Sequence, residues 1–148
     1  MSLDGNPEKD AIEARLKDLV GGRVLRELPE ELQLVRDDLT SLIKPYIYLS
    51  FGSLYPSATD RSIEGEAQQP HIMPITVECW AAVKGASEAA AGAVRTLMIG
   101  WDPEIDNASE IAARGGGNFE SKDASGRPTR FMESVVLVTT INLSTTAP

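Results

Sequence analysis

The sequence predicts an α+β fold in which two helices pack on one mostly antiparallel or mixed β-sheet. In three stretches apolar and polar residues alternate, as they do in half-buried strands, and in two others apolar residues recur with helical spacing. The predicted strands are 45–52, 74–83 and 130–143, and the predicted helices are 7–20 and 87–99. With 148 residues the chain can bury about two thirds of its unfolded surface, which predicts a single domain over residues 1–148.

Composition narrows the classes of function. The net charge is −8, from 14 Lys and Arg against 22 Asp and Glu, which disfavours binding to a phosphate backbone as the main role. Cys79 is the only cysteine, and its place on the apolar face of a strand predicts a small buried side chain without a disulfide. The N-terminus has no basic and apolar leader segment, and no stretch reaches about 18 apolar residues, so neither secretion nor a membrane span is expected.

The N-terminal part begins with a helix and continues irregularly. Asn6 is a capping residue, Pro7 suits the first helical position, and Gly21-Gly22 ends the predicted helix. The apolar stripe that we expect in the core consists of Ile12, Leu16, Leu19 and Val20. Residues 23–44 keep no sustained period and are predicted to be mostly coil with one brief strand.

Strand 45–52 and strand 74–83 form the centre of the prediction. The first carries bulky residues on both faces, which favours an inner place in the sheet. In the second, PITVECWAAV, every second residue is apolar, so one face goes to a core. Gly85-Ala86-Ser87-Glu88 then supplies turn and N-cap chemistry for helix 87–99. Trp80 lies on the polar face of its strand, where it either packs under a helix or belongs to an interface.

Two long excursions separate these elements. Residues 55–73 and 100–129 contain most of the turn residues, and loops of such length are usually functional or disordered. Gly115-Gly116-Gly117 lacks the Lys-Ser/Thr of a phosphate-binding loop, and we interpret it as a hinge. Strand 130–143 follows, apolar on both faces near its middle, and residues 144–148 are expected to be a frayed tail.

No catalytic or metal constellation emerges from the polar residues. His71 is the only histidine and is interpreted as a solvated loop residue. Asp102, Glu104, Asp106 and Glu110 have the spacing of calcium ligands, but Asn107 replaces the turn glycine and Ala113 replaces the bidentate acid. We therefore interpret these acids as a solvated turn and predict no catalytic, cofactor or metal residue.

A local basic excess follows the glycines. It consists of Arg114, Lys122, Arg127 and Arg130, against Glu120 and Asp123. These charges are either a solvated face or a contact for an acidic neighbour.

The order of the elements resembles a known family. The chain passes from a helix and Leu28-Pro29 through PYIYLSFGS, a long polar loop and PITVECWAAV, to a small-residue helix that ends in LMIGW and a last strand, FMESVVLVTTINL. In this order, and in the PYIYLSFGS and GW-P pieces, it resembles the tail terminator (tail completion) proteins of long-tailed bacteriophages, particularly the non-contractile-tailed phages of actinobacteria. The resemblance covers nearly the whole chain and includes no catalytic motif.

The resemblance implies a structural virion protein that is assembled in the host cytoplasm and is not an enzyme. Such proteins form a ring, usually of six copies, that sits on the last ring of tail-tube protein, stops tube polymerisation and presents a surface to the head connector, while DNA only passes through. No cofactor or membrane is implied. Loops that are costly to order in a small domain become favourable when neighbouring copies bury them. The candidate interface residues in these loops are Tyr55, Arg61, Glu64, Trp101, Arg114, Lys122 and Arg127.

Two alternatives stay open at this point. Another head-tail connector or tail-tube component would share the size and the long loops, and its position in a particle would distinguish it. A small-ligand-binding domain or an enzyme would need a pocket with convergent polar groups, which His71 and the scattered acids do not supply.

Overall fold

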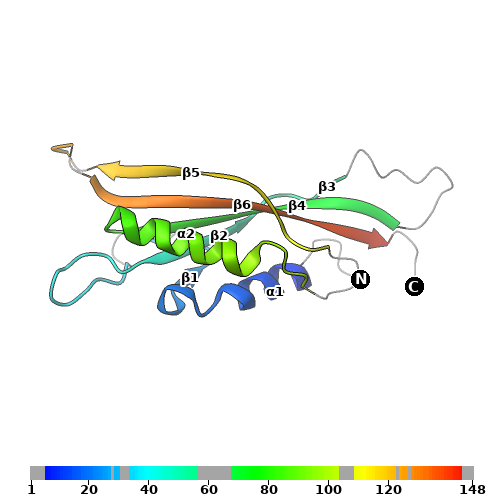
Figure 1. Ribbon diagram of the computed structural model, residues 1–148, viewed down its shortest axis with the longest axis horizontal. Helices are drawn as coiled ribbons and strands as arrows, with labels where there is room; N and C mark the ends of the chain where they lie inside the picture. The colour runs from blue at the N-terminus through cyan, green and yellow to red at the C-terminus, as the bar shows by residue number, and fades with distance from the viewer. Residues whose placement is uncertain are drawn as a thin grey trace.

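The computed structural model describes residues 6–27, 29–30, 34–56, 68–103, 109–122, 124–126 and 128–144. The helical elements are α1 (Asn6–Leu16), the 3-10 helix η1 (Leu19–Gly22) and α2 (Lys84–Met98). The strands are β1 (Val24–Leu25), β2 (Tyr46–Phe51), β3 (Tyr55–Pro56), β4 (Gln68–Ala81), β5 (Ala112–Lys122) and β6 (Pro128–Ser144). The predicted α+β class is confirmed (Figure 1).

The strands form one mixed sheet. Its order is β1-β2-β4-β6-β5, and β3 pairs with β4 beside this path. Only β1 and β2 run parallel, and the other pairs are antiparallel. The longest pairing joins β4 to β6 over the whole of β4, from Gln68↔Ser144 to Ala81↔Phe131. The sheet is therefore built around two long central strands, with β5 along one margin (Figure 1).

The core lies between one face of this sheet and the two helices. Alternate residues of β4 are fully buried, because each second side chain of a strand points to the same face. They pack with alternate residues of β2 and β6, with small and aliphatic residues of α2, and with the apolar side of α1. The main members are Ile12, Leu16, Ile47, Leu49, Met73, Ile75, Val77, Cys79, Ala91, Val94, Met98, Val135, Leu137 and Ile141. The predicted core face of 74–83 is confirmed as far as Ala81, and so is the burial of Cys79. The last residue assigned to that face, Val83, lies beyond the end of β4 as the N-cap of α2 and is 56% exposed.

Both helices differ from their predicted bounds. α1 ends at Leu16 rather than residue 20. It cannot include residue 20, because Val20 and Gly21 of η1 have left-handed backbone angles (φ 48° and 67°) that no α-helix contains. α2 starts three residues before the predicted helix, and its N-cap is Val83, without a side-chain cap. The Ser87 hydroxyl instead donates to the Lys84 carbonyl (2.7 Å), so it sits inside the first turn.

The two long excursions were predicted wrongly in part. β4 begins at Gln68, so His71 is a strand residue that pairs with Ile141 on one side and Pro56 on the other. β5 lies inside the excursion 100–129, and its glycines are paired with β6 rather than forming a hinge. Residues 57–67 and 104–108, which make up other parts of the predicted excursions, lie outside the described residues, as do 145–148 of the predicted tail.

Three further predictions of secondary structure agree with the structure. β2 and β6 cover the predicted strands 45–52 and 130–143 to within two residues at each end. β2 is an inner strand, as its two bulky faces predicted, since β1 and β4 flank it. The short β1 is the brief strand expected in the otherwise irregular segment 23–44.

Candidate interaction surface

The described residues contain no group of three or more His, Cys, Asp or Glu side chains that could hold a metal ion. Of the four acids that have the spacing of calcium ligands, Asp102 and Glu110 are exposed, and Glu104 and Asp106 lie outside the described residues. No helix in the described part of the chain is both long and apolar enough to cross a membrane.

Cys79 has the properties of a core residue rather than of a nucleophile. Its side chain is fully buried, and burial raises the pKa of the thiol to about 12. A thiol must ionise to react, so at neutral pH this one stays protonated and inert.

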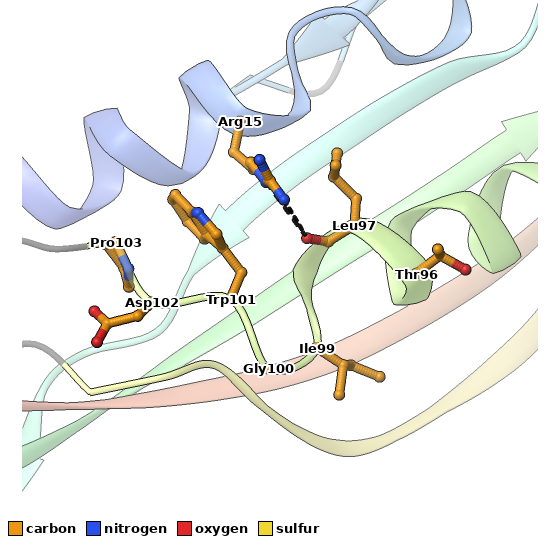
Figure 2. Close-up of a pocket in the computed structure, with 8 residues that line it drawn as sticks. All are labelled: Arg15, Thr96, Leu97, Ile99, Gly100, Trp101, Asp102 and Pro103. Carbon is orange, nitrogen blue, oxygen red and sulfur yellow. Dashed lines mark hydrogen bonds between the residues drawn. The ribbon is translucent and has the colours of Figure 1, made fainter.

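An open hollow lies where α2 ends. Its volume is about 610 Å³, and it is lined by Arg15, Thr96, Leu97, Ile99, Gly100, Trp101, Asp102 and Pro103. Figure 2 shows the Arg15 side chain reaching from α1 to the carbonyl oxygen of Leu97, to which its Nε and one terminal nitrogen donate (3.4 and 3.3 Å). The same guanidinium lies 5.1 Å from the centre of the Trp101 ring.

The contacts of Arg15 are those expected of a helix terminus. The last carbonyls of a helix have no partner within the helix and carry partial negative charge, which a cationic donor satisfies. Gly100, with φ 82°, takes the left-handed conformation that lets the chain turn away after α2. We interpret the contacts of Arg15 beside this hollow as structural, because they hold α1 against the end of α2.

A row of aromatic side chains crosses the sheet face opposite the helices. Trp80 stacks on Tyr46 of β2, with ring centres 6.2 Å apart and planes 6° from parallel. On its other side it packs edge to face with Phe119 of β5, with ring centres 6.1 Å apart and planes at 70°. The Arg130 guanidinium lies 5.9 Å from the centre of the Trp80 ring. The Trp80 indole N–H donates to the Glu78 carboxylate (3.0 Å).

The position of this row excludes one of the two interpretations of Trp80. Val77 and Cys79 point to the helices, so Trp80 lies on the helix-free face and does not pack under a helix. Tyr46 is almost completely covered, whereas Phe119 is 53% exposed. The row therefore runs from a covered end on β2 to an open end on β5.

β5 itself is the least covered element of the sheet. All its residues except Ser121 are exposed, on both faces. A register shift between Ala113 and Gly115 bulges the strand, and a second one lies at its end. The middle of β5 is tied to β6 by Ser134, whose hydroxyl accepts from the Gly117 N–H (2.9 Å) and contacts the Gly117 carbonyl oxygen (3.3 Å).

The predicted interface residues are distributed over three places. Arg114 and Lys122 both lie on β5 and are exposed; Tyr55 is in β3 and 41% exposed; and Trp101 is partly covered in the hollow. The other three, Arg61, Glu64 and Arg127, lie outside the described residues. A role of these residues at an interface stays a prediction.

Sequence reasoning missed Phe119 and Ser134. Phe119 follows a glycine run in a stretch without apolar alternation, so no periodic signal identified it. Ser134 lay within a predicted strand, but its bond to Gly117 depends on pairing with a strand that was not predicted.

Comparison with known proteins supports the fold and reaches no further. No protein-family model and no curated protein sequence matches this chain. Among solved structures, a chain of the "virion of native gene transfer agent (GTA) particle" is similar, with a TM-score of 0.61 and 18% sequence identity. The similarity covers 97% of this chain and 100% of the other. This protein shares its fold with a virion component. At 18% identity this similarity shows a shared fold.

Proposed function

We propose that this protein is a structural component of a phage-like virion, a tail terminator that closes into a homomeric ring of six copies. The ring caps the tail tube, ends its polymerisation and joins the tail to the head connector. The observation that carries the proposal is the similarity to a chain of a gene transfer agent virion, which extends over almost the whole of both chains. It concerns the complete arrangement of helices and strands rather than one shared motif.

The resemblance noted in the sequence supports the more specific role. Its pieces coincide with the elements that build the centre of the fold: PYIYLSFGS contains β2, PITVECWAAV covers most of β4, and the GW-P piece follows α2 directly. The ring, its number of copies and its place between tube and connector are taken from this resemblance.

The shape of the sheet is suited to a closed ring. Copies in a cyclic ring meet through two different patches, one on each side of the subunit. The two margins of this sheet differ in that way, since β1 is two residues long and lies near α1, whereas β5 is 11 residues long and exposed (Figure 1). The net charge of −8 is compatible with a channel through which DNA slides without sticking.

The decisive experiment is genetic. Particles are purified from a phage that lacks this gene product and from the same phage complemented in trans, and tails are imaged by electron microscopy. Overlong tubes of uncontrolled length, whether or not they are joined to heads, are expected, with rescue on complementation. Tails of normal length joined to heads would refute the proposal. Complete loss of tubes would instead identify a tube subunit, and unjoined tails of normal, narrow length distribution would favour a connector.

A second experiment uses the purified protein. Native mass measurement and negative-stain imaging are expected to give a ring with a central hole and about six times the monomer mass of 15.9 kDa. A protein that stays monomeric over the accessible concentration range, or forms only two-fold dimers, would contradict the ring.

A further inference from the structure

The outer edge of β5 is a long edge of the described sheet at which no described strand pairs. Among the strands that the structure describes, only β6 pairs with β5. A strand with one neighbour and with both faces in water buries little apolar surface, so on its own it gains little from being ordered. A second strand at its free edge would complete the missing main-chain hydrogen bonds.

The direction of the free main-chain groups follows from one hydrogen bond. The Gly117 N–H points to β6, because it donates to the Ser134 hydroxyl (2.9 Å). Neighbouring residues of a strand direct their N–H groups to opposite sides, so Asn118 and, two residues later, Glu120 direct theirs to the outer edge. The outer edge therefore offers regularly spaced donors and acceptors.

The usual devices that protect an edge strand are weak in the middle of β5. Natural proteins blunt such edges by shortness, proline, charge or a bulge. β5 is 11 residues long, contains no proline, and has its register shifts near Arg114 and Lys122. The charged residues Arg114, Glu120 and Lys122 bracket the uncharged run 115–119, GGGNF, which leaves this run open to pairing.

No contact within the described chain requires a glycine at position 117. Gly115 has φ 142°, which side chains rarely adopt, and a Cβ on Gly116 would collide with the Ser134 carbonyl oxygen at 2.2 Å. At Gly117 a Cβ would meet nothing nearer than the Ser134 hydroxyl oxygen at 3.8 Å. Glycine inside a strand often indicates the close approach of another backbone, and at Gly117 no described segment makes that approach.

We propose that the outer edge of β5, centred on residues 117–120, pairs by main-chain hydrogen bonds with an extended strand of a second copy of this chain. The inference deepens the proposed ring and takes from it the choice of a second copy as the occupant. Charge is compatible with that choice, since the cations Arg114 and Lys122 flank the run and reduce at this edge the repulsion expected from a partner of net charge −8. In a ring the partner strand is not another β5, because two facing β5 edges would generate a two-fold dimer.

Residue-resolved amide hydrogen exchange tests the pairing with an internal control. Exchange is compared between dilute monomer and assembled protein of the wild-type sequence. The N–H groups of Asn118 and Glu120 should exchange at least about tenfold more slowly after assembly. Those of Gly117 and Phe119, which face β6, should be protected in both states. Assembled protein in which Asn118 and Glu120 exchange as fast as in the monomer would overturn the proposal.

A matched pair of variants tests the same edge by assembly. Asn118→Pro removes the outward donor and obstructs a partner strand, whereas it leaves the bond from Gly117 to Ser134 in place. Asn118→Thr keeps the N–H group and suits a strand. We expect the proline variant to require at least about tenfold higher concentration to assemble, and the threonine variant to resemble wild type. Circular dichroism of both monomers checks that the fold is retained, and equal assembly of the two variants would contradict the proposal.

The outcomes separate this inference from the proposed function. A ring whose β5 amides stay unprotected would refute edge pairing and leave the terminator proposal standing. A two-fold dimer with protected β5 amides would support edge pairing and refute the ring. Wild-type protein that never self-associates would refute both.

Discussion

At the scale of single residues, position on the sheet decides both chemistry and stability. Cys79 and Thr76 belong to the same strand, yet one is fully buried against the helices and the other lies on the opposite, partly exposed face. For Cys79 this burial raises the pKa of the thiol to about 12, because an ionised sulfur would lose its hydration.

Stability should therefore depend on Cys79 at alkaline pH. In the unfolded chain a thiol ionises near pH 8.5, whereas in the folded protein it keeps its proton up to about pH 12. The folded state then binds more protons, so the thiol's contribution is intact below about pH 8.5 and falls by up to about 1.4 kcal/mol per pH unit above it. Urea unfolding from pH 7 to 10 should show a smaller loss of stability in Cys79→Ala than in wild type. Parallel curves for the two proteins would contradict this.

Truncation of core residues tests the assigned faces. Val77 of β4 pairs with Val135, and Leu137 of β6 pairs with Ile75. Both side chains are fully buried, so Ala at either position leaves a cavity. We expect Leu137→Ala to lower the free energy of unfolding by about 2–4 kcal/mol and Val77→Ala by about 1–3 kcal/mol. Thr76→Ala, on the helix-free face, is the control and should cost well under 1 kcal/mol. Denaturant unfolding curves measure the free energy of unfolding of all three variants. Equal values for the three would show that these side chains were assigned to the wrong faces of the sheet.

At the scale of elements, β5 depends on glycine at one position and tolerates a side chain at the next. A methyl group on Gly116 would collide with the Ser134 main chain, so β5 has to move away from β6. We expect Gly116→Ala to cost about 1–3 kcal/mol in the monomer, as overpacked sites do. Gly117→Ala meets no atom within 3.4 Å and should change monomer stability by less than about 1 kcal/mol in either direction. Thermal unfolding at low protein concentration distinguishes the two, and a larger loss for Gly117→Ala would overturn the described register.

The junction of α1 and α2 depends on Arg15. Its guanidinium donates to the Leu97 carbonyl at the end of α2 and lies over Trp101 (Figure 2). Arg15→Met keeps the aliphatic stem but removes charge and donors, and should cost about 0.5–2 kcal/mol. Lys17→Met, an exposed cation on the same segment, is the matched control and should change stability by less than about 0.5 kcal/mol. Equal unfolding free energies for the two variants would show that Arg15 does not brace the helices.

At the scale of the whole molecule, charge should control assembly. Each copy carries a net charge of −8, so ring closure brings like charges together. Raising ionic strength from 0.01 to 0.15 M shortens the screening length from about 30 to about 8 Å and weakens this repulsion. Sedimentation velocity should therefore show assembly at lower protein concentration in the higher salt, with a neutral osmolyte of equal osmolality as the control. Dissociation by salt would mean that attractive ion pairs between copies outweigh the net repulsion.

The sequence by itself determined the elements that are half buried. β2, β4, β6 and α2 each turn one side to the core. Because the residues on that side are apolar, apolar residues recur along the sequence with the period of the strand or helix. For the same reason the core face of β4 and the burial of Cys79 could be predicted. The α+β class and the absence of a predicted chemical centre followed from these patterns and from the single histidine.

Only the tertiary structure showed which segments are strands because they pair with a neighbouring strand rather than because they bury apolar side chains. β5 is exposed on both faces and gains its order from β6, so its glycine-rich sequence has no period and by itself indicates a hinge. The first residues of β4, His71 among them, are strand because β6 extends beside them. Which face Trp80 occupies relative to the helices, and its meeting with Phe119, also depended on pairing between segments far apart in the chain. Backbone hydrogen bonds do not depend on side-chain identity, and so they leave no pattern in the sequence of the strand that makes them.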